Sequence, residues 1–542
     1  MEKNLTLYQS IKKVSSEIPN ETAIYYFNTK ISFSKLLSEI DELASILQNL
    51  YRIEKGDVVL VSLPNIPETI VLFYALNKIG AISNMVHPNS PCELMQKYYD
   101  DANCKMAFLY ENRVYKEIKS YLDFKGTIVL CSPGHYLHKK EKGYYYFANR
   151  KIVKELKETH KFQFFHRLKS NGLISEEVVL EDNETAVLLH SASTTGISKT
   201  ICLGSRSFNF TASRVSEIMC MKKEELIGKS LISVLPSFHG FGLCMTMYAP
   251  LYNGFGVVLI PRFSAKEIAR AMKKHKNVIC ICGVPSIFKA LTLEPSFINS
   301  RYLKTLQSCF SGGDTLPSLI KENFDTIMIR KNSRCRLYEG YGLTEALSVC
   351  SVNTLRKHKY GSIGYPISGV EFKILDDKNN ELPTYKVGEI AIKSENNMLG
   401  YFNDPAASKK TYSGEYLKTG DLGYIDEDGF IYFSSRRKRV IKVNGVAVFP
   451  HEIEETILTL SGINSVCVVQ IPDPNTVHAA KAYVVSRNKD KERIINVCKK
   501  KLITWSIPRE IEFVKSLPMT RYNKVDYMKV QEMEDKKRKE IV

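Results

Sequence analysis

Residues 190–200 read H-S-A-S-T-T-G-I-S-K-T and directly follow an apolar run at 186–189. Small side chains allow backbone N–H groups to approach an anion, and a lysine adds a point charge to the same oxygens. The pattern indicates a phosphate-binding loop that includes Thr194, Thr195, Gly196 and Lys199. Taken alone, however, such a run is more often a solvated Ser/Thr/Gly turn.

Four further segments carry groups that suit a nucleotide and a metal ion. The segment 338–345, Y-E-G-Y-G-L-T-E, offers a ring to stack on a base, a hydroxyl for phosphate and a carboxylate for Mg²⁺. In 417–423, L-K-T-G-D-L-G, Asp421 follows a glycine turn and can accept hydrogen bonds from two ribose hydroxyls. The segments 436–445, R-R-K-R-V-I-K-V-N-G, and 518–526, P-M-T-R-Y-N-K-V-D, are basic. Each segment by itself is compatible with a turn or a solvated charge.

Strand and helix patterns alternate from the N-terminus to about residue 430. Helical apolar spacing at 36–50 and 68–79 is interleaved with strand-like runs at 57–63 and 81–86. Further buried strands are expected at 186–189, 230–235, 256–260, 278–282 and 306–310. Strands that alternate with helices predict parallel sheets with helices packed on them, which is an α/β fold.

The character of the chain changes near residue 430. Four consecutive cations at 436–439 precede a strand at 440–443. Short elements follow, namely a helix at 450–460, strands at 465–471 and 480–486, and a helix at 494–502. We therefore expect a large domain over residues 1–437 and a small α+β domain over 438–542.

The bulk composition narrows the class of protein. The chain has 542 residues, of which 44% are hydrophobic and 25% charged, as in a globular enzyme. A net charge of +18 favours anionic partners, but no nucleic-acid-binding motif is present, so nucleic acid is not expected as a partner. Thirteen cysteines without a C-x-x-C pair favour a reducing compartment. Because no signal peptide or integral membrane segment is recognisable, we expect a cytoplasmic protein.

The stretch 134–170 is basic and aromatic and interrupts the alternating pattern. A surface insertion outside the main fold is the favoured interpretation, since long connections usually lie on the surface. A contact with substrate or with a membrane is the alternative.

Read in order, the five segments resemble the signature segments of the adenylate-forming superfamily. This superfamily includes acyl- and aryl-CoA synthetases, firefly luciferase and the adenylation domains of nonribosomal peptide synthetases. Further segments are similar to family segments at 56–68, 235–242, 283–288, 311–317, 361–366 and 449–454. The resemblance covers nearly the whole chain. It implies a large N-terminal domain of layered sheets and helices and a small mobile C-terminal domain.

The resemblance also implies a two-step reaction. A carboxylic acid attacks the α-phosphate of ATP to give an acyl-adenylate and pyrophosphate, and a thiol then displaces AMP. The family's loop around the β- and γ-phosphates corresponds to Thr194, Thr195, Gly196 and Lys199. Its adenine site corresponds to Tyr341, Gly342, Gly312 and Gly313. Its α-phosphate contact corresponds to Thr344, its Mg²⁺ ligand to Glu345, and its ribose contacts to Asp421 and Arg436.

In the C-terminal part, Lys524 corresponds to the lysine that bridges the carboxylate and the α-phosphate, and Lys438 to the hinge between the domains. Lys442 and Gly445 lie on the segment that approaches the thiol, on the coenzyme A side. The sequence departs from the family pattern at Ser193 and Ser198 in the phosphate loop, at Tyr522 and Asn523 beside the lysine, and at Ser435 before the ribose arginine.

His239 bears on the choice of acid. The segment Ser237-Phe238-His239 contains no acidic side chain to pair with an α-ammonium group, and Phe-His here resembles fatty acid and aryl acid ligases. A histidine satisfied within the core is the alternative. Coenzyme A is the favoured acceptor. Two other interpretations stay open: an adenylation enzyme that loads an acyl or aminoacyl group onto an acidic carrier protein, and a non-catalytic relative that binds nucleotide or acyl ligand.

Overall fold

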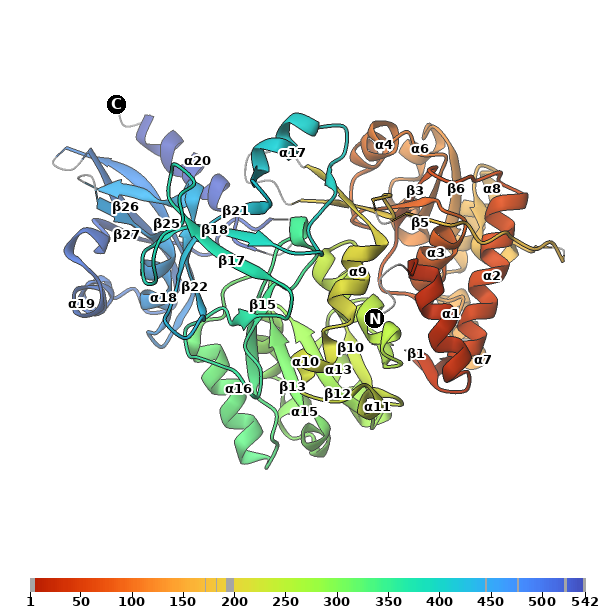
Figure 1. The fold of residues 1–542 in the computed structure, drawn as a ribbon, viewed down its shortest axis with the longest axis horizontal. Coiled ribbons are helices and arrows are strands. Elements are labelled where there is room, and N and C mark those ends of the chain that lie inside the picture. The colour runs from red at the N-terminus through yellow and green to blue at the C-terminus, as the bar shows by residue number, and fades with distance from the viewer. Residues whose placement is uncertain are drawn as a thin grey trace.

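The computed structural model describes residues 5–170, 172–181, 183–191, 199–443, 446–474, 477–520 and 524–539. Two large sheets with helices around them form most of the N-terminal part of the chain (Figure 1). The smaller C-terminal part, drawn in blue, lies at the left-hand end of the molecule, and the first helices, drawn in red, lie at the right-hand end. The α/β class and the pairing of a large with a smaller part are confirmed.

The first large sheet has eight strands in the order β19-β9-β8-β4-β3-β5-β6-β7. In that order they span Gly400–Tyr401, Thr200–Leu203, Val187–His190, Ile82–Met85, Val58–Ser62, Met106–Tyr110, Thr127–Cys131 and Gln163–Phe164. The strands from β8 to β7 run parallel, whereas β9 pairs antiparallel with both of its neighbours.

The second large sheet has nine strands in the order β16-β15-β14-β13-β12-β10-β11-β1-β2. In that order they span Tyr365–Pro366, Ser351–Val352, Leu337–Tyr341, Ser308–Ser311, Val278–Gly283, Ser230–Ser233, Gly256–Leu259, Thr22–Tyr26 and Thr29–Ser32. From β14 to β1 all pairs are parallel. The carboxyl ends of these strands therefore meet at one edge, where open α/β sheets bind ligands.

Helices cover both faces of the eight-stranded sheet. In β3, Val59 and Val61 join the core shared with the nine-stranded sheet, whereas Val58 and Leu60 join a second core on the other face. Successive side chains of a strand point to opposite faces, so a strand buried on both sides becomes a continuous apolar run. Helix α3 (Pro67–Lys78) is buried at all of its residues, as expected for a helix packed on every side.

The remaining helices of the N-terminal part are grouped by place. Those that contribute to the shared core or lie along the nine-stranded sheet are α1 (Leu7–Glu17), α2 (Phe33–Asn49), α9 (Ser205–Ala212), α10 (Val215–Met219), α11 (Lys223–Leu226), α12 (Ala249–Tyr252), α13 (Ala265–Lys274), α14 (Pro285–Leu291), α15 (Pro295–Ile298) and α16 (Ser318–Arg330). Those beside the second core are α4 (Cys92–Asp101), α5 (Glu111–Lys116), α6 (Ile118–Leu122) and α8 (Arg150–Glu158).

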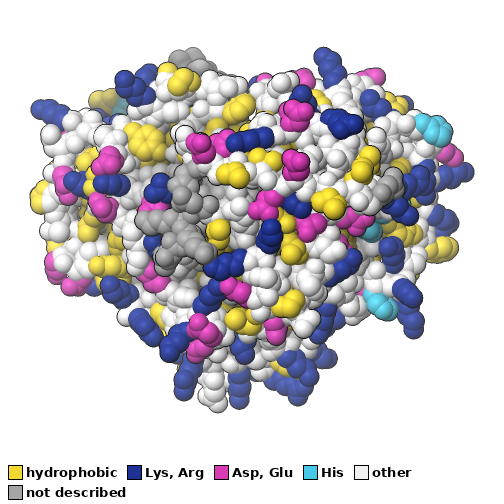
Figure 2. All heavy atoms as spheres, turned by 45° about the vertical axis from the view of Figure 1, so that its right-hand side comes forward, with side chains coloured by type: hydrophobic (Ala, Val, Ile, Leu, Met, Phe, Trp, Pro, Cys, Tyr) yellow, Lys and Arg dark blue, Asp and Glu magenta, His cyan; other side chains and the backbone are white. Residues whose placement is uncertain are grey.

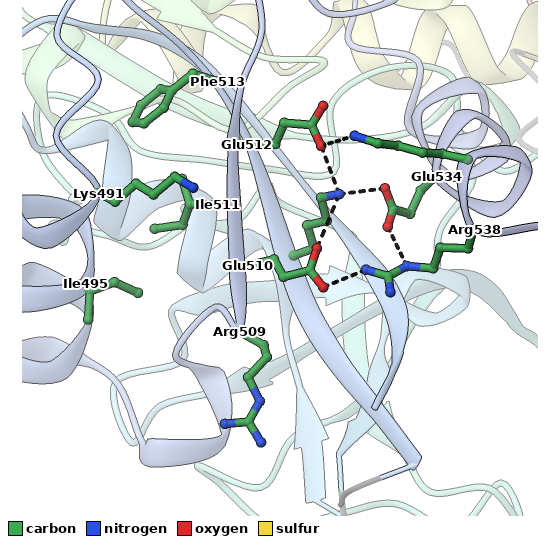
Figure 3. Close-up of a pocket in the computed structure, with 11 residues that line it drawn as sticks. Lys491, Ile495, Arg509, Glu510, Ile511, Glu512, Phe513, Glu534 and Arg538 are labelled. Carbon is green, nitrogen blue, oxygen red and sulfur yellow. Dashed lines mark hydrogen bonds and ion pairs between the residues drawn. The ribbon is translucent and has the colours of Figure 1, made fainter. Parts of the chain in front are cut away.

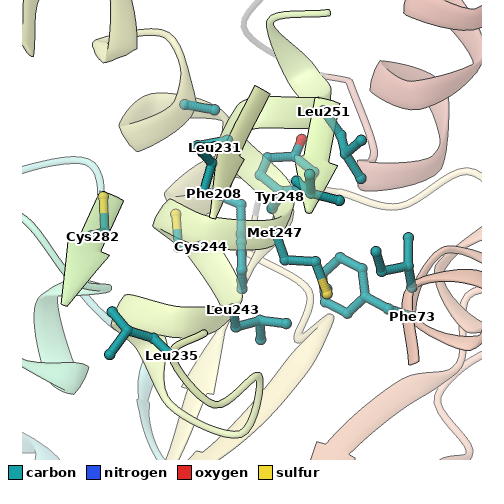
Figure 4. Close-up of a cluster of buried hydrophobic side chains, with 14 of the residues drawn as sticks. Phe73, Phe208, Leu231, Leu235, Leu243, Cys244, Met247, Tyr248, Leu251 and Cys282 are labelled. Atoms are coloured by element: carbon teal, nitrogen blue, oxygen red, sulfur yellow. The ribbon is translucent and has the colours of Figure 1, made fainter. Parts of the chain in front are cut away.

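An eight-residue π-helix, Phe241–Tyr248, begins within the segment 235–242 and was not foreseen. Its Tyr248 packs edge-on against Phe208 of α9, with 5.4 Å between ring centroids, in the cluster drawn in Figure 4. A Cβ atom on Gly242 would lie 2.0 Å from the carbonyl oxygen of Pro236, so only glycine fits there. The π-helix is rare and occurs most often at functional sites.

The expected insertion at 134–170 is wrong in part, because this stretch belongs to the main fold. It contains α7 (Lys139–Ala148) and α8, and it ends in β7, which pairs parallel with β6 and extends the eight-stranded sheet. Parallel neighbours need a long crossover, usually helical, and α7 and α8 provide it. Leu156 of α8 is fully buried.

A five-stranded sheet leads to the C-terminal part. It consists of β17 (Glu371–Leu375), β18 (Gly388–Lys393), β20 (Tyr412–Ser413), β21 (Tyr416–Ile425) and β22 (Ile431–Arg436), with α17 (Pro405–Thr411) beside it. The C-terminal part then contains β23 (Ile441–Val443), β24 (Val446–Val448), α18 (Pro450–Leu458), β25 (Ile463–Asp473), β26 (Val477–Ser486), α19 (Lys491–Lys501), β27 (Glu510–Phe513) and α20 (Tyr527–Lys539). The four elements expected at 450–502 are all present.

A buried lysine ties β26, β27 and α20 together. The ammonium group of Lys481 lies 2.8 Å from Glu534, 2.9 Å from Glu512 and 3.4 Å from Glu510. These residues line a hollow of 720 Å³ in the C-terminal part (Figure 3). Since its carboxylates already pair with cations of the chain, we assign this hollow a structural role.

We predict that Lys481→Ala lowers the free energy of unfolding of the C-terminal part by about 3 kcal/mol, because it removes the buried cation that the three carboxylates share and leaves them only the more exposed Lys537 and Arg538. The single tryptophan, Trp505, lies in this part, so its fluorescence during urea unfolding reports the loss. Lys491→Ala is the control. Lys491 lines the same hollow but forms no ion pair with the residues that the structure describes, so its loss should shift the unfolding transition little. Equal transitions for parent and Lys481→Ala would contradict the prediction.

Candidate functional site

Two glycine-containing turns lie at the carboxyl edge of the nine-stranded sheet. Gly312 and Gly313 follow β13, and Gly342 follows β14. A Cβ atom on Gly342 would lie 1.2 Å from the carbonyl oxygen of Ser348, so no other residue fits without a backbone shift. Gly313 has φ +75°, a left-handed conformation that favours glycine. Because glycine has no side chain, a ligand can approach the backbone closely at this edge.

Asp421 and Arg436 lie opposite each other in the antiparallel pair β21–β22. Arg436 Nε is 2.8 Å from Asp421 Oδ1, and the hydroxyl of Tyr341, the last residue of β14, donates to Asp421 Oδ2 at 2.7 Å. Burial raises the pKa of Asp421 above its ordinary value, while Arg436 and Tyr341 act in the opposite direction. Three residues predicted from separate segments are thus joined by one ion pair and one hydrogen bond.

Lys524 comes to the same place from the C-terminal part. Its ammonium group donates to the carbonyl oxygen of Gly313. The N–H of Thr520 donates to the carbonyl of Lys524 at 2.7 Å, which fits the expected turn. Desolvation lowers the pKa of Lys524 and the nearby Arg436 lowers it further, against the attraction of Asp314 and Asp421.

Glu345 and Lys199 meet through Tyr401 of β19. The Tyr401 hydroxyl lies 3.2 Å from Glu345 Oε1, and Lys199 Nζ lies 4.1 Å from the centroid of the Tyr401 ring. Burial raises the pKa of Glu345, and Arg436 and Lys199 oppose this shift. The lysine that ends the phosphate-loop segment therefore lies on the same side of the site as the predicted metal ligand.

Glu345 suits Mg²⁺ as a single carboxylate. Across the described ranges, no group of three or more His, Cys, Asp or Glu side chains is placed to hold a metal ion. Mg²⁺ bound with a nucleotide typically takes one or two carboxylates together with phosphate oxygens and water. The donor set is therefore compatible with a metal that arrives with the nucleotide.

Thr344 and His239 occupy tight turns near the glycines. Thr344 begins the short 3₁₀ helix Thr344–Ala346, and its carbonyl accepts from Leu347 N at 3.2 Å. The carbonyl of His239 accepts from Leu243 N at 2.7 Å as the π-helix begins, and its ring lies 4.8 Å from that of Phe238. The described contacts assign neither side chain a role.

The remaining predicted residues divide into two groups. Lys438 lies in the single 3₁₀ turn Arg437–Arg439 directly after β22, and Lys442 is exposed on β23. Thr194, Thr195, Gly196 and Gly445 lie outside the described residues.

The site also contains residues that the sequence reasoning did not select. Tyr401 links Lys199 with Glu345, and Asp314 lies close enough to influence the pKa of Lys524. Glu339 accepts a hydrogen bond from Leu316 N at 2.9 Å between the two glycine turns. Asp314 lies within the segment 311–317 and Glu339 within 338–345. Their positions beside the glycines could have marked both as site residues. Nothing in the sequence marks Tyr401.

A large α/β part with this site at the strand ends, faced by a small α+β part, defines an ATP-dependent adenylate-forming enzyme. Residues 11–402 match the family of AMP-binding enzymes, and residues 452–524 match the AMP-binding enzyme C-terminal domain. The chain belongs to this family, and it is an AMP-forming acid–thiol ligase of the acyl-CoA synthetase type.

Individual relatives are similar to this chain over most of its length. A long-chain-fatty-acid–CoA ligase from Bacillus subtilis is 29% identical over 532 residues, 96% of this chain and 93% of the relative. A probable 4-coumarate–CoA ligase 3 from Dictyostelium discoideum is 29% identical over 473 residues, 85% of this chain and 81% of the relative. An anthranilate CoA ligase in complex with anthranoyl-AMP has the same fold, with a TM-score of 0.81 and 21% identity over 98% of this chain and 97% of that one.

We predict a pH dependence of stability from Glu339, because burial raises its pKa to about 8. Its ordinary pKa is about 4.3, so the folded state binds the proton more tightly than the unfolded chain. Stability from this group is therefore complete at low pH and falls as the pH rises toward 8. Glu339→Gln keeps an acceptor for Leu316 N and should flatten the fall of the melting temperature between about pH 5 and 8.

Glu93→Gln at an exposed position of α4 is the control and should leave the slope unchanged. If Glu339→Gln follows the parent at every pH, the carboxyl ionises normally and the prediction is wrong.

Proposed function

We propose that the protein activates a fatty or aryl carboxylic acid with ATP and transfers the acyl group to coenzyme A, releasing AMP and pyrophosphate. The observation that carries this proposal is the contact of Lys524 with Gly313, which brings a cation from the C-terminal part to the group of Asp421, Arg436 and Tyr341. We also propose a cytoplasmic location, which rests on the cysteine usage of the sequence.

The nucleotide lies along the strand ends in this proposal. Tyr341 stacks on adenine, and the bond from its hydroxyl to Asp421 fixes the plane of the ring. Asp421 and Arg436 hold the ribose, while the bare backbone at Gly312 and Gly313 borders the base. Lys199, the loop at Thr194–Gly196 and Thr344 contact the phosphates. Glu345 would hold Mg²⁺, which would supply charge neutralisation to the phosphates.

Lys524 allows two anions to meet. The attacking carboxylate and the α-phosphate repel each other, and negative charge moves toward pyrophosphate as the reaction proceeds. A fixed ammonium group between them stabilises that charge without reorganisation of water. Partial desolvation, which lowers the pKa of Lys524, supports this electrostatic role.

We place the domain boundary and hinge at 437/438. Arg437 pairs with Glu389 of β18 at 2.5 Å, on the N-terminal side. Arg439 pairs with Glu454 of α18 and lies 4.6 Å from the ring of Tyr527, on the C-terminal side. Because Arg437 is held on one side and Arg439 on the other, Lys438 is the residue at which rotation would occur. Rotation there would bring the segment of Lys442 and Gly445 toward the thiol.

The class of acid is proposed from the absence of a carboxylate in the segment 237–239. Ser237, Phe238 and His239 provide no carboxylate for an α-ammonium group. The relatives named for long-chain fatty acid and 4-coumarate support the same two classes.

We predict ATP–pyrophosphate exchange with fatty or aromatic acids and little with common amino acids. The physical reason is that a buried ammonium group without a counter-charge is strongly disfavoured. Exchange is measured across a panel of acids, followed by addition of coenzyme A or of an acidic phosphopantetheinyl carrier protein. Exchange restricted to amino acids would overturn the proposed acid, and thioester formed only on the carrier would overturn the proposed acceptor.

We predict that Lys524→Ala slows acyl-adenylate formation about a hundredfold and leaves conversion of supplied acyl-adenylate and coenzyme A to thioester near the parent rate. Lys438→Pro should have the reverse effect, because a fixed φ restricts the hinge. Each half-reaction is measured separately.

Lys515→Ala removes an exposed lysine from the same part of the chain and serves as the control. Equal loss in both half-reactions for Lys524→Ala, with a normal melting curve, would rule out the bridging role.

A further inference from the structure

Helices α7 and α8 lie in the right-hand half of Figure 1, far from the C-terminal part. Asn149 separates them, yet helical hydrogen bonds continue through the junction: Asn149 N donates to Tyr145 O at 2.9 Å, and Val153 N donates to Asn149 O at 3.0 Å. Residues three and four apart therefore share one face along both helices.

The inner face of these helices is fixed to the fold. The hydroxyl of Tyr145 donates to Glu111 Oε1 at 2.8 Å, and Lys142 Nζ donates to His135 O at 2.8 Å. Leu156 is fully buried in the second core. The outer face is therefore held in a defined orientation.

The outer face combines exposed rings with cations. We call it the basic–aromatic face and define it by Lys140, Tyr144, Phe147, Arg150, Lys151 and Lys154. Tyr144 is 76% exposed and Phe147 66% exposed, and Arg150 lies over the Phe147 ring at 4.8 Å. Two large rings exposed on a fixed helix expose apolar area to water, which a partner surface would cover.

The charge of this region is strongly positive. Residues 139–169 contain ten Lys and Arg and three Glu. The pairs Lys151–Glu155 and Lys154–Glu158 have N···O distances of 3.8 and 3.7 Å on exposed side chains, so they neutralise the surface only weakly. Figure 2 shows Lys and Arg side chains gathered toward the right-hand edge of that view.

We propose that the basic–aromatic face docks the protein onto an anionic lipid bilayer. Aromatic side chains favour the boundary between headgroups and acyl chains, and lysine and arginine are attracted to anionic headgroups. A nucleic acid or an acidic protein would match the charge but offers no apolar layer for Tyr144 and Phe147. The face lies far from the C-terminal part, so docking leaves the proposed hinge free (Figure 1).

Docking depends on neither the acid nor the thiol assigned above, so it can be tested without substrates. The full chain is sedimented with vesicles of phosphatidylcholine containing about one third phosphatidylserine, and with vesicles of phosphatidylcholine alone. We expect binding to the anionic vesicles that weakens as salt is raised. Failure of the parent to bind them overturns the proposal, whatever the enzyme's activity.

Two variants separate charge from apolar contact. Lys140→Glu/Lys151→Glu/Lys154→Glu should bind the anionic vesicles at least about tenfold more weakly, because each cation near such a surface changes binding about fivefold. Tyr144→Ser/Phe147→Ser should also bind several-fold more weakly, and this loss should persist at high salt. If the charge variant has an altered melting curve, glutamine at the same three positions replaces it.

The matched control is Lys499→Glu/Lys500→Glu/Lys501→Glu on α19, which makes the same change in net charge at the other end of the molecule. It should bind vesicles almost as the parent does. An equal loss in this control, or Tyr144→Ser/Phe147→Ser binding vesicles as the parent does, overturns the proposal. So does tighter binding of the face to duplex DNA than to anionic vesicles.

Discussion

Asp421 and Arg436 face each other across β21 and β22, with 2.8 Å between carboxylate and guanidinium. The carboxylate is buried, so its charge depends on Arg436 and on the hydroxyl of Tyr341 for compensation. This pair joins the five-stranded sheet to the end of β14. The chain then leaves β22 and enters the turn at Arg437–Arg439, so the same strand that orients the site also begins the connection to the C-terminal part.

The parallel order of the nine-stranded sheet explains why distant segments meet. The turns after β13 and β14 lie side by side because their strands are paired, and Gly342 allows the second turn to pass against Ser348. Lys524 can reach Gly313 only because the C-terminal part packs over this edge. The two parts also meet where Lys289 Nζ donates to the carbonyl oxygen of Asn464 at 3.2 Å and where the rings of Phe433 and His451 lie 5.4 Å apart.

Charge is organised differently at the two ends of the molecule. In the C-terminal part, Lys481 is surrounded by Glu510, Glu512 and Glu534, and the charges compensate within the fold. On α7 and α8 the cations project outward beside exposed rings. Positive charge that is not compensated within the fold can attract an anionic partner.

The sequence by itself determined the α/β class, the helices and strands of the C-terminal part, and the order of the five chemical segments, because periodicity and residue type are local properties. It also selected Asp421, Arg436, Tyr341 and Lys524, which the structure brings together. Only the tertiary structure decided that Tyr401 links Lys199 to Glu345, that residues 241–248 form a π-helix, and that 134–170 ends in a strand of the main sheet. These features depend on contacts between residues far apart in the chain, and such contacts leave no local pattern in the sequence.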